Sequence, residues 1–138
     1  MYEFAVERLI AAAPGKIWSI LTDSSRLGSG PFGIVRIEGD IALGRSIKLW
    51  SAVSPKRAFP LKVATIDTDR SMTWRGGMPF GLFTGTRTFT LEPKGVTTVF
   101  RMREVYEGHM TPLIWKSMPD LNPSFHQFAT ALAAEAEA

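Results

Sequence analysis

The C-terminal segment Leu121–Ala138 restricts the fold of this chain more than any other feature. Its apolar residues recur every three or four positions, the spacing that places side chains on one face of a helix. These residues are Leu121, Phe125, Phe128, Leu132 and Ala136. Asn122 suits the N-cap, and Pro123 suits the first helical position. The sequence therefore predicts one long amphipathic helix at the end of the chain.

Most of the chain before this helix alternates apolar and polar residues, which is the pattern of half-buried strands. Strands are predicted over Tyr2–Ala12, Gly33–Glu38, Gly44–Val53, Phe59–Asp67, Ser71–Arg75, Phe83–Glu92 and Val96–Glu107. Short turns join them, including Ser54–Lys56 and Pro93–Gly95, so an antiparallel meander is expected. The predicted fold class is α+β, a sheet closed by the C-terminal helix.

Two shorter helical segments interrupt this pattern. A helix is predicted over Ala13–Leu21, because Pro14 suits a helix start and apolar residues follow on one side. The Ser- and Gly-rich segment Thr22–Phe32 is expected to hold at most one helical turn. Leu113–Met118 is predicted as a separate turn or short helix, because prolines separate it from the last helix.

Bulk properties favour one domain over residues 1–138. Hydrophobic residues make up 45% of the chain, which is sufficient for a full core, and the absence of cysteine excludes disulfides and thiolate chemistry. The net charge is +3, but the basic residues are dispersed and are expected to point outward, so no nucleic-acid role is predicted. No signal peptide or membrane-spanning segment is recognised, and a cytoplasmic location is expected.

Strand alternation places two charged residues on an otherwise apolar face. Phe100, Met102, Glu104 and Tyr106 share one face of their strand, and Phe83, Gly85, Arg87, Phe89 and Leu91 alternate against four threonines. If the hairpin turn pairs Leu91 with Thr98, Arg87 lies opposite Met102 and diagonal to Glu104. An arginine side chain can span that diagonal, which is about 7–8 Å between α-carbons. An Arg87–Glu104 pair on the inner face is therefore predicted.

Several segments together resemble the START-like (SRPBCC) superfamily, which has the birch-pollen-allergen fold. They are APGKIWSILTD, the G-x-x-I-x-L pattern of Gly44–Leu49, RSMTWRGG, LFTGTRTFTLEPKGVTTVFRMREVYEG and FHQFATALAAEAE. Their order and spacing are most similar to the bacterial polyketide cyclase/dehydrase and lipid-transport-like group. The chain departs from the common pattern at Leu27–Phe32, where many members carry a Trp and an Asn, and this affects the shape of the pocket mouth.

The resemblance implies a helix-grip fold, in which a curved antiparallel sheet of about seven strands wraps the C-terminal helix around an apolar cavity. Members bind lipids, sterols, polyketides or plant hormones, and a few are enzymes. In this chain the expected ligand-binding residues are Trp74, Phe83, Arg87, Phe89, Phe100, Met102, Glu104, Tyr106, Phe125 and Phe128. The alternative is that these side chains fill the space and leave no cavity.

Glu104 is the candidate catalytic residue, because a carboxylate in an apolar cavity could act as an acid or base. The favoured alternative is a structural pair with Arg87. Arg87 could also bind a ligand carboxylate or phenolate.

His109 and His126 lack a metal-ligand pattern, so no metal or cofactor is predicted. The glycine-rich segment Arg75–Leu82 lacks the spacing of a phosphate-binding loop, and its apolar side chains could instead form a gate over the pocket or an ordinary hairpin loop.

Three functions remain open at this point. The first is non-catalytic binding of a hydrophobic or aromatic small molecule, lipid- or polyketide-like, with Arg87 and Glu104 fixing its orientation. The second is a polyketide cyclase, dehydratase or isomerase that uses Glu104 to move protons. The third is a module in which the basic sheet surface contacts a protein partner, as some family members contact a chaperone. A monomer or a homodimer is compatible with each of these functions.

Overall fold

The computed structural model describes residues 2–138. Its seven strands form one antiparallel sheet in the order β1-β7-β6-β5-β4-β3-β2. The strands are β1 (Glu3–Ile10), β2 (Ile34–Glu38), β3 (Ser46–Ser51), β4 (Ser54–Asp67), β5 (Ser71–Met78), β6 (Phe83–Lys94) and β7 (Thr97–Glu107). Strands β2 to β7 form the predicted meander, and β1 pairs with β7, so the first strand lies beside the last. The predicted α+β class is confirmed.

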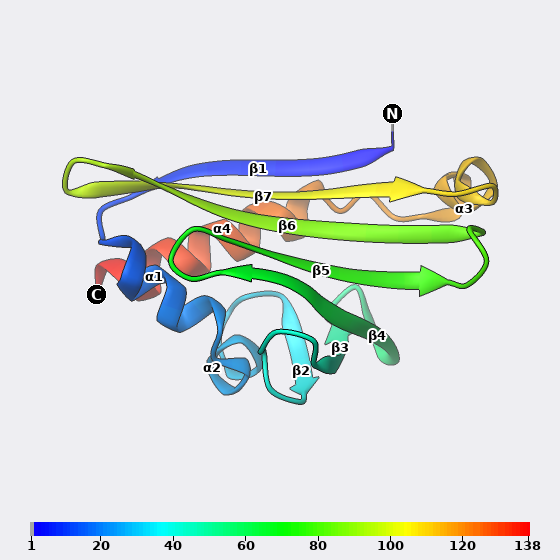
Figure 1. The fold of residues 1–138 in the computed structure, drawn as a ribbon, viewed down its shortest axis with the longest axis horizontal. Coiled ribbons are helices and arrows are strands. Elements are labelled where there is room, and N and C mark those ends of the chain that lie inside the picture. Colours follow the sequence, from blue (N-terminus) through cyan, green and yellow to red (C-terminus); the bar gives the residue numbers. More distant parts are fainter. Residues whose placement is uncertain (1) are drawn as a thin grey trace.

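Four helices accompany the sheet within the described residues (Figure 1). They are α1 (Pro14–Leu21), α2 (Ser24–Ser29), α3 (Thr111–Ser117) and α4 (Asn122–Glu137). The segment containing α1 and α2 carries the chain from β1 at one edge of the sheet to β2 at the other edge. None of the described helices is long and apolar enough to cross a membrane.

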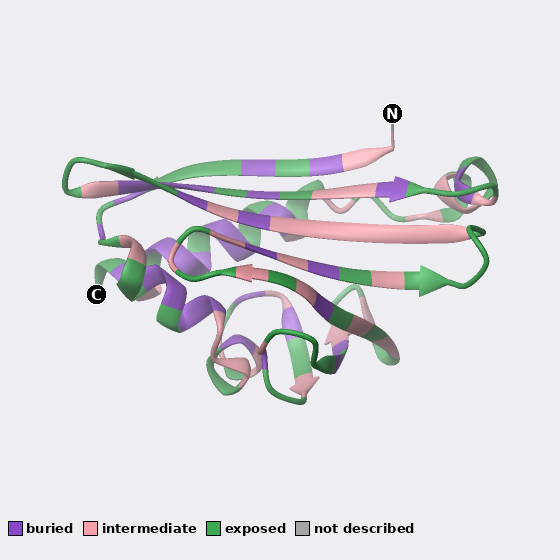
Figure 2. Ribbon diagram, in the orientation of Figure 1, coloured by how far each residue is buried: buried purple, intermediate pink, exposed green. Residues whose placement is uncertain are grey.

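Helix α4 lies against the inner face of the sheet and buries the predicted stripe. Phe125, Phe128, Leu132 and Ala136 are buried, and Leu121 packs at the edge of the same core. Large side chains from β5, β6 and β7 meet this stripe, so the sheet and the helix share one apolar layer. Figure 2 shows buried stretches on α4 and on these strands. The predicted face of the helix is confirmed.

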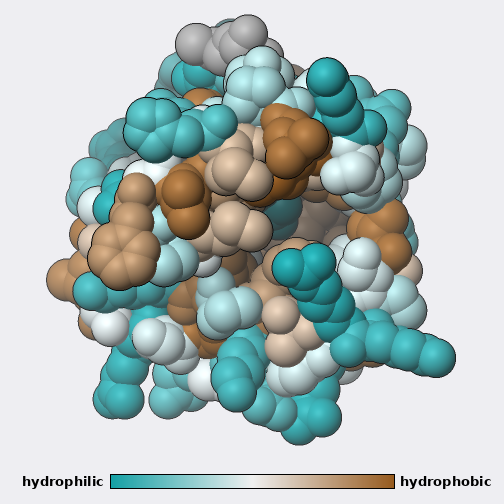
Figure 3. All heavy atoms as spheres, turned by 90° about the vertical axis from the view of Figure 1, so that its right-hand side faces the viewer, coloured by the Kyte–Doolittle hydropathy of each residue, from teal (hydrophilic) through white to brown (hydrophobic). Residues whose placement is uncertain are grey.

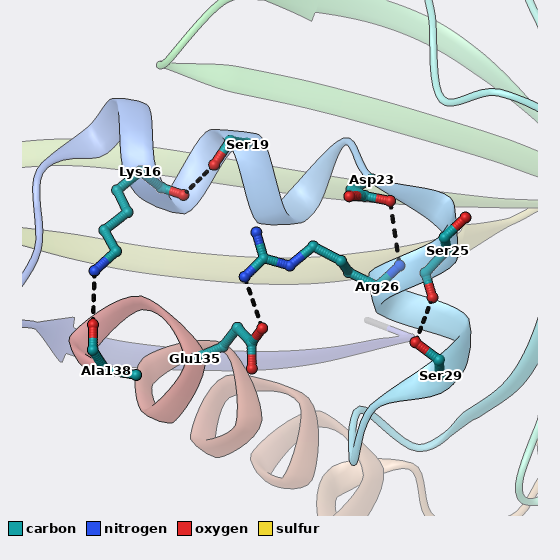
Figure 4. Close-up of polar contacts among 8 residues, drawn as sticks. All are labelled: Lys16, Ser19, Asp23, Ser25, Arg26, Ser29, Glu135 and Ala138. Carbon is teal, nitrogen blue, oxygen red and sulfur yellow. Dashed lines mark hydrogen bonds and ion pairs between the residues drawn. The ribbon is translucent and has the colours of Figure 1, made fainter.

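Polar contacts fix α1 and α2 against the end of α4 (Figure 4). Arg26 Nη2 donates to Glu135 Oε1 at 2.6 Å, and Lys16 Nζ donates to the carbonyl oxygen of Ala138 at 2.9 Å. The Asp23 carboxylate accepts a hydrogen bond from the Arg26 backbone N–H and caps α2. This cap explains why Ser24–Ser29 forms a complete short helix rather than the single turn expected at most.

The start of α4 differs from the prediction. Leu121, not Asn122, occupies the N-cap position, and Asn122 and Pro123 both lie inside the first turn. The Asp120 carboxylate accepts hydrogen bonds from the backbone N–H and the side-chain amide of Asn122, at 3.0 and 2.9 Å. Asp120 therefore supplies the acceptor that Asn122 was expected to supply.

The hairpin between β6 and β7 also corrects the predicted register. Lys94 pairs with Thr97, and Gly95 adopts a φ of 64°, a conformation that glycine tolerates without steric cost. The turn is therefore shorter than the Pro93–Gly95 turn that was expected. Leu91 pairs with Phe100 instead of Thr98, which brings Arg87 directly opposite Glu104 instead of diagonal to it.

Strand β4 begins at Ser54, so the prediction of a turn at Ser54–Lys56 was wrong. The chain reverses at Ala52–Val53 instead. Irregular register within β4 and β3 bends this part of the sheet around α4. The dispersed basic residues are exposed, as expected. They are Arg26, Arg36, Arg45, Lys48, Lys56, Arg57, Lys62, Arg70 and Arg75.

Candidate ligand-binding site

The space between the sheet and α4 has two ends that differ in packing. At the end near the C-terminus, which we call the packed end, the inward side chains are Phe89, Leu91, Phe100, Phe128 and Leu132. Each is at most 3% exposed. The Phe128 ring lies 6.1 Å from the Phe89 ring and 6.2 Å from the Phe100 ring, between centroids. Side chains fill the space at this end, so these phenylalanines form core.

The opposite end, which we call the open end, lies where β5 ends, β6 begins and α4 begins. Its inward residues are Gly76, Phe83, Gly85, Arg87, Glu104 and Tyr106. Most are only half-buried, and Figure 2 shows this as a continuous intermediate stretch at the start of β6. Viewed from this end, the surface is hollowed near its centre, and apolar side chains border much of the hollow, together with hydrophilic ones (Figure 3).

Two glycines form the floor of the open end. Gly76 of β5 and Gly85 of β6 lie directly opposite each other on the inner face. Leu61 Cδ2 lies 2.6 Å from where a β-carbon of Gly76 would stand, and the Tyr106 ring lies 3.2 Å from the equivalent point at Gly85. Because neither glycine has a side chain, Leu61 and Tyr106 can lean over the sheet. Leu61 and Tyr106 therefore pack into the space above the two glycines and give this part of the sheet an apolar surface.

An ion pair stands beside this floor. Arg87 Nε donates to Glu104 Oε1 at 2.7 Å, and the two side chains are 21% and 16% exposed. The Arg87 guanidinium carbon also lies 4.9 Å from the centre of the Phe125 ring of α4, a cation–π distance. Arg87 and Glu104 thus share the inner face, as alternation predicted, and contact each other.

Aromatic side chains from four elements wall this end. The Phe83 and Tyr106 rings stack with centroids 5.7 Å apart, and Trp115 of α3 packs on Phe4 of β1 at 5.0 Å. Burial raises the pKa of the Tyr106 hydroxyl, and the neighbouring Glu104 carboxylate raises it further. Tyr106 therefore stays protonated and acts as a hydrogen-bond donor at ordinary pH.

Trp74 and Met102 connect the two ends. Trp74 lies directly opposite Arg87, its ring packs edge-on against Phe89 at 4.8 Å, and it is 1% exposed. Its indole Nε1 is buried and has no hydrogen-bond partner among residues 2–138. Met102 is buried beside Phe89 on β7. The sequence predicted Trp74 as a lining residue but contained no sign of its unsatisfied N–H.

The chemistry available at the open end is limited. Glu104 is engaged by Arg87, and His109 and His126 are both exposed. Within the described chain, no group of three or more histidine, cysteine, aspartate or glutamate residues could hold a metal ion. This arrangement can bind an apolar molecule and orient its polar group, and its candidate base, Glu104, is held by Arg87 through Oε1.

The apolar gate expected over Arg75–Leu82 is not closed in this structure. Phe80, at the tip of the loop, is 93% exposed, and Met78 and Leu82 are also exposed. The loop is fixed beside α3, because the backbone N–H groups of His109 and Met110 donate to the carbonyls of Gly81 and Leu82. These apolar side chains border the open end without covering it.

Two other depressions lie on the surface, one on the outer face of the sheet and one that shares Phe4 and Trp115 with the open end. One of about 780 Å³ follows the outer face of the sheet, over the threonines of β6 and their neighbours on β7 and β1. Exposed ion pairs border it, including Arg101–Glu7 and Arg103–Glu3. It is open and polar at its edges, so it offers an apolar molecule little burial. A smaller one, of about 360 Å³, lies between Glu3, Trp115 and Asn122.

Sequence comparisons identify no relative, since no family model and no curated protein matches the chain. Solved structures do match. Protein MLL2253 from Mesorhizobium loti is 17% identical, with a TM-score of 0.75 over 97% of this chain and 96% of its own. The Aha1 dimer from Colwellia psychrerythraea is 20% identical, with a TM-score of 0.73 over 99% of this chain and 97% of its own.

The chain has the helix-grip fold. A third match, DynU16 of the dynemicin biosynthetic locus, is 14% identical, with a TM-score of 0.68 over 96% of this chain and 46% of its own. The resemblance to the START-like superfamily is thus confirmed at the level of the fold. Identities this low carry no information about ligand or activity.

Four residues of the open end were not predicted as part of it: Phe4, Leu61, Gly76 and Trp115. Gly76 was the most accessible to prediction, because a glycine inside a strand often marks close approach of another group. Leu61 lies beside Gly76 because Lys62 of β4 pairs with Arg75 of β5, whereas Trp115 reaches the site through the position of α3.

Proposed function

We propose that the open end binds a hydrophobic small molecule, lipid- or polyketide-like, without catalysing a reaction on it. The observation that carries this proposal is the hollow at the open end (Figure 3), where the half-buried side chain of Phe83 lies on the same inner face as the Arg87–Glu104 ion pair. Burial of a ligand there contributes roughly 25 cal/mol per Å² before entropic costs. The Arg87–Glu104 pair would orient the molecule.

One further fact supports binding over catalysis. Glu104 is paired, so the described site has no unengaged base for the cyclase-type alternative. DynU16 belongs to a biosynthetic locus, which is compatible with a small-molecule ligand but does not distinguish a binder from an enzyme. Turnover by a Glu104-dependent mechanism would require that the carboxylate exchange Arg87 for substrate.

The proposal is tested with N-phenyl-1-naphthylamine, a neutral dye that fluoresces in apolar sites. We expect saturable binding to the folded protein. Gly85→Trp places a large side chain on the floor and should abolish binding while the protein remains folded. Thr88→Trp is the matched control, because Thr88 lies on the same strand but faces the outer depression. Unchanged binding in Gly85→Trp, or loss only in Thr88→Trp, would reject this site.

A second candidate function is contact with a partner, and two observations favour it. Phe80, Leu82 and Leu113 are exposed apolar residues on the β5–β6 loop and α3, which are hydrogen-bonded neighbours. One structure of the same fold is a dimer, the Aha1 protein. If this surface mediates self-association, sedimentation should show a concentration-dependent dimer that Phe80→Ser weakens. A monomer at all concentrations would remove homodimerisation from consideration.

A further inference from the structure

The hydrogen-bonding capacity of the open end is unequally used. Glu104 is engaged by Arg87, whose Nε donates to Oε1. Around the hollow, by contrast, there are more hydrogen-bond donors than acceptors paired with them.

Arg87 carries most of the donors that have no acceptor. A guanidinium offers five N–H donors and accepts nothing. Its Nε is committed to Glu104, whereas its two terminal nitrogens have no hydrogen-bond partner within residues 2–138. Its only other recorded contact there is with the face of Phe125. The pair is about a fifth exposed, so a ligand entering the hollow could reach this group.

Trp74 adds a second unsatisfied donor from the neighbouring strand. An indole N–H can only donate, and the buried Nε1 of Trp74 has no partner in the described chain. Buried donors without partners are uncommon in folded proteins and call for a specific explanation. Trp74 and Arg87 occupy directly opposite positions on β5 and β6, so their β-carbons lie about 5 Å apart on the same face.

We propose that the ligand carries an anionic oxygen group, such as a carboxylate, and that Arg87 and Trp74 bind this group. The inference rests on the proposed function and specifies its ligand class. The apolar part of the molecule would lie over the Gly76–Gly85 floor, and the oxygen anion would face the terminal nitrogens of Arg87 and the indole N–H of Trp74. Glu104 then holds Arg87 in place through Nε and leaves the rest of the guanidinium for the ligand.

Two dyes with the same ring system test this proposal. 1-Anilinonaphthalene-8-sulfonate carries a sulfonate, and N-phenyl-1-naphthylamine lacks it. Trp74→Phe removes the N–H and keeps an aromatic ring. Arg87→Met/Glu104→Gln removes the guanidinium without changing the net charge of the pair. Trp50→Phe is the control, because it removes an indole N–H from β3, outside the site.

We expect each site variant to weaken binding of the sulfonated dye at least about tenfold, the usual effect of losing a hydrogen bond to a charged group. Binding of the neutral dye should change by less than about twofold, and Trp50→Phe should affect neither dye. Thermal melting confirms that each variant is folded, and the two site variants provide independent tests should one fail to fold.

The outcomes separate this inference from the proposed function. If neither dye binds the wild-type protein, both are overturned. If both dyes bind but the site variants change them equally, the hollow binds apolar molecules and the anion site is overturned. If the sulfonated dye binds Trp74→Phe and Arg87→Met/Glu104→Gln as tightly as the wild-type protein, exposed cations hold the dye. That result also overturns the anion site.

Discussion

The two ends of the space between the sheet and α4 are built from the same strands but differ in how fully side chains fill them. At the packed end, β6 and β7 present Phe89, Leu91 and Phe100, and α4 fills the space between them with Phe128 and Leu132. At the open end, the same two strands present Gly85, Arg87, Glu104 and Tyr106, and the surface is hollowed. The difference lies in side-chain volume rather than in backbone architecture.

This contrast indicates how the fold separates stability from binding. A filled end contributes close-packed contacts, and an open end leaves surface whose burial is available to a ligand. If the division holds, the same substitution should have different consequences at the two ends. The predictions below run from the largest expected effect to the smallest.

Phe100→Ala should destabilise the protein by about 3–5 kcal/mol, because Phe100 is fully buried and its removal leaves a cavity that the aromatic neighbours cannot fill. Urea denaturation measures this change. Dye affinity of the folded protein should be nearly unaffected, since Phe100 lies away from the floor. A loss below about 1 kcal/mol would show that the packed end is not close-packed.

Arg87→Met and Glu104→Gln should each cost about 1–3 kcal/mol of stability. Breaking a buried pair typically costs about 3–5 kcal/mol, and this pair is partly exposed, which lowers the expected loss. The double variant should recover much of the loss, because no charge is then left without a partner. Strictly additive losses in the double-mutant cycle would mean that the pair contributes no coupling energy.

Phe83→Ala is the same truncation as Phe100→Ala, made at the open end. It should reduce dye affinity more than stability, the reverse of what is expected for Phe100→Ala. Phe83 is half-buried and stacks on Tyr106, so its removal should cost only about 1 kcal/mol in stability. Neutral-dye affinity should fall about tenfold, because one apolar wall is lost. Equal effects of the two truncations on stability and on affinity would erase the distinction between the ends.

Tyr106 provides a smaller, pH-dependent effect. Its pKa is raised in the folded protein, mainly by burial, so the folded state keeps a proton that the unfolded state releases near pH ~10. The unfolded state therefore binds fewer protons above that pH, and stability should fall as pH rises, by about 1 kcal/mol at pH ~11. In Tyr106→Phe this part of the pH dependence should be absent. Parallel wild-type and variant profiles between pH ~9 and ~11 would contradict the assignment.

Local patterns in the sequence predicted much of this architecture. The stripe of α4 and the alternation of β6 and β7 follow from periodicity, and they placed Arg87 and Glu104 on one face before any contact was known. The register of that pair did not follow, because it depends on the short turn at Gly95. A shift of two residues preserves the inward face, so alternation alone cannot detect it.

No pattern in the sequence indicated that the two ends differ in packing. Phe89 and Phe83 look alike in an alternating strand, but only Phe89 meets Phe128 and Trp74 in three dimensions. Leu61 reaches the floor because the register between β4 and β5 places it beside Gly76, and the unsatisfied N–H of Trp74 follows from packing among distant segments. Such features depend on tertiary contacts, which no local pattern encodes.

Binding at the open end is the central claim, and amide chemical shifts test it directly. A ¹H–¹⁵N correlation spectrum recorded during titration with N-phenyl-1-naphthylamine reports where the molecule binds. We predict saturable shifts at Gly76, Gly85 and Tyr106, with little change at Leu91 or Leu132 of the packed end. Shifts centred on Thr86, Thr88 and Thr90 of the outer face, or no shifts at all, would contradict the account.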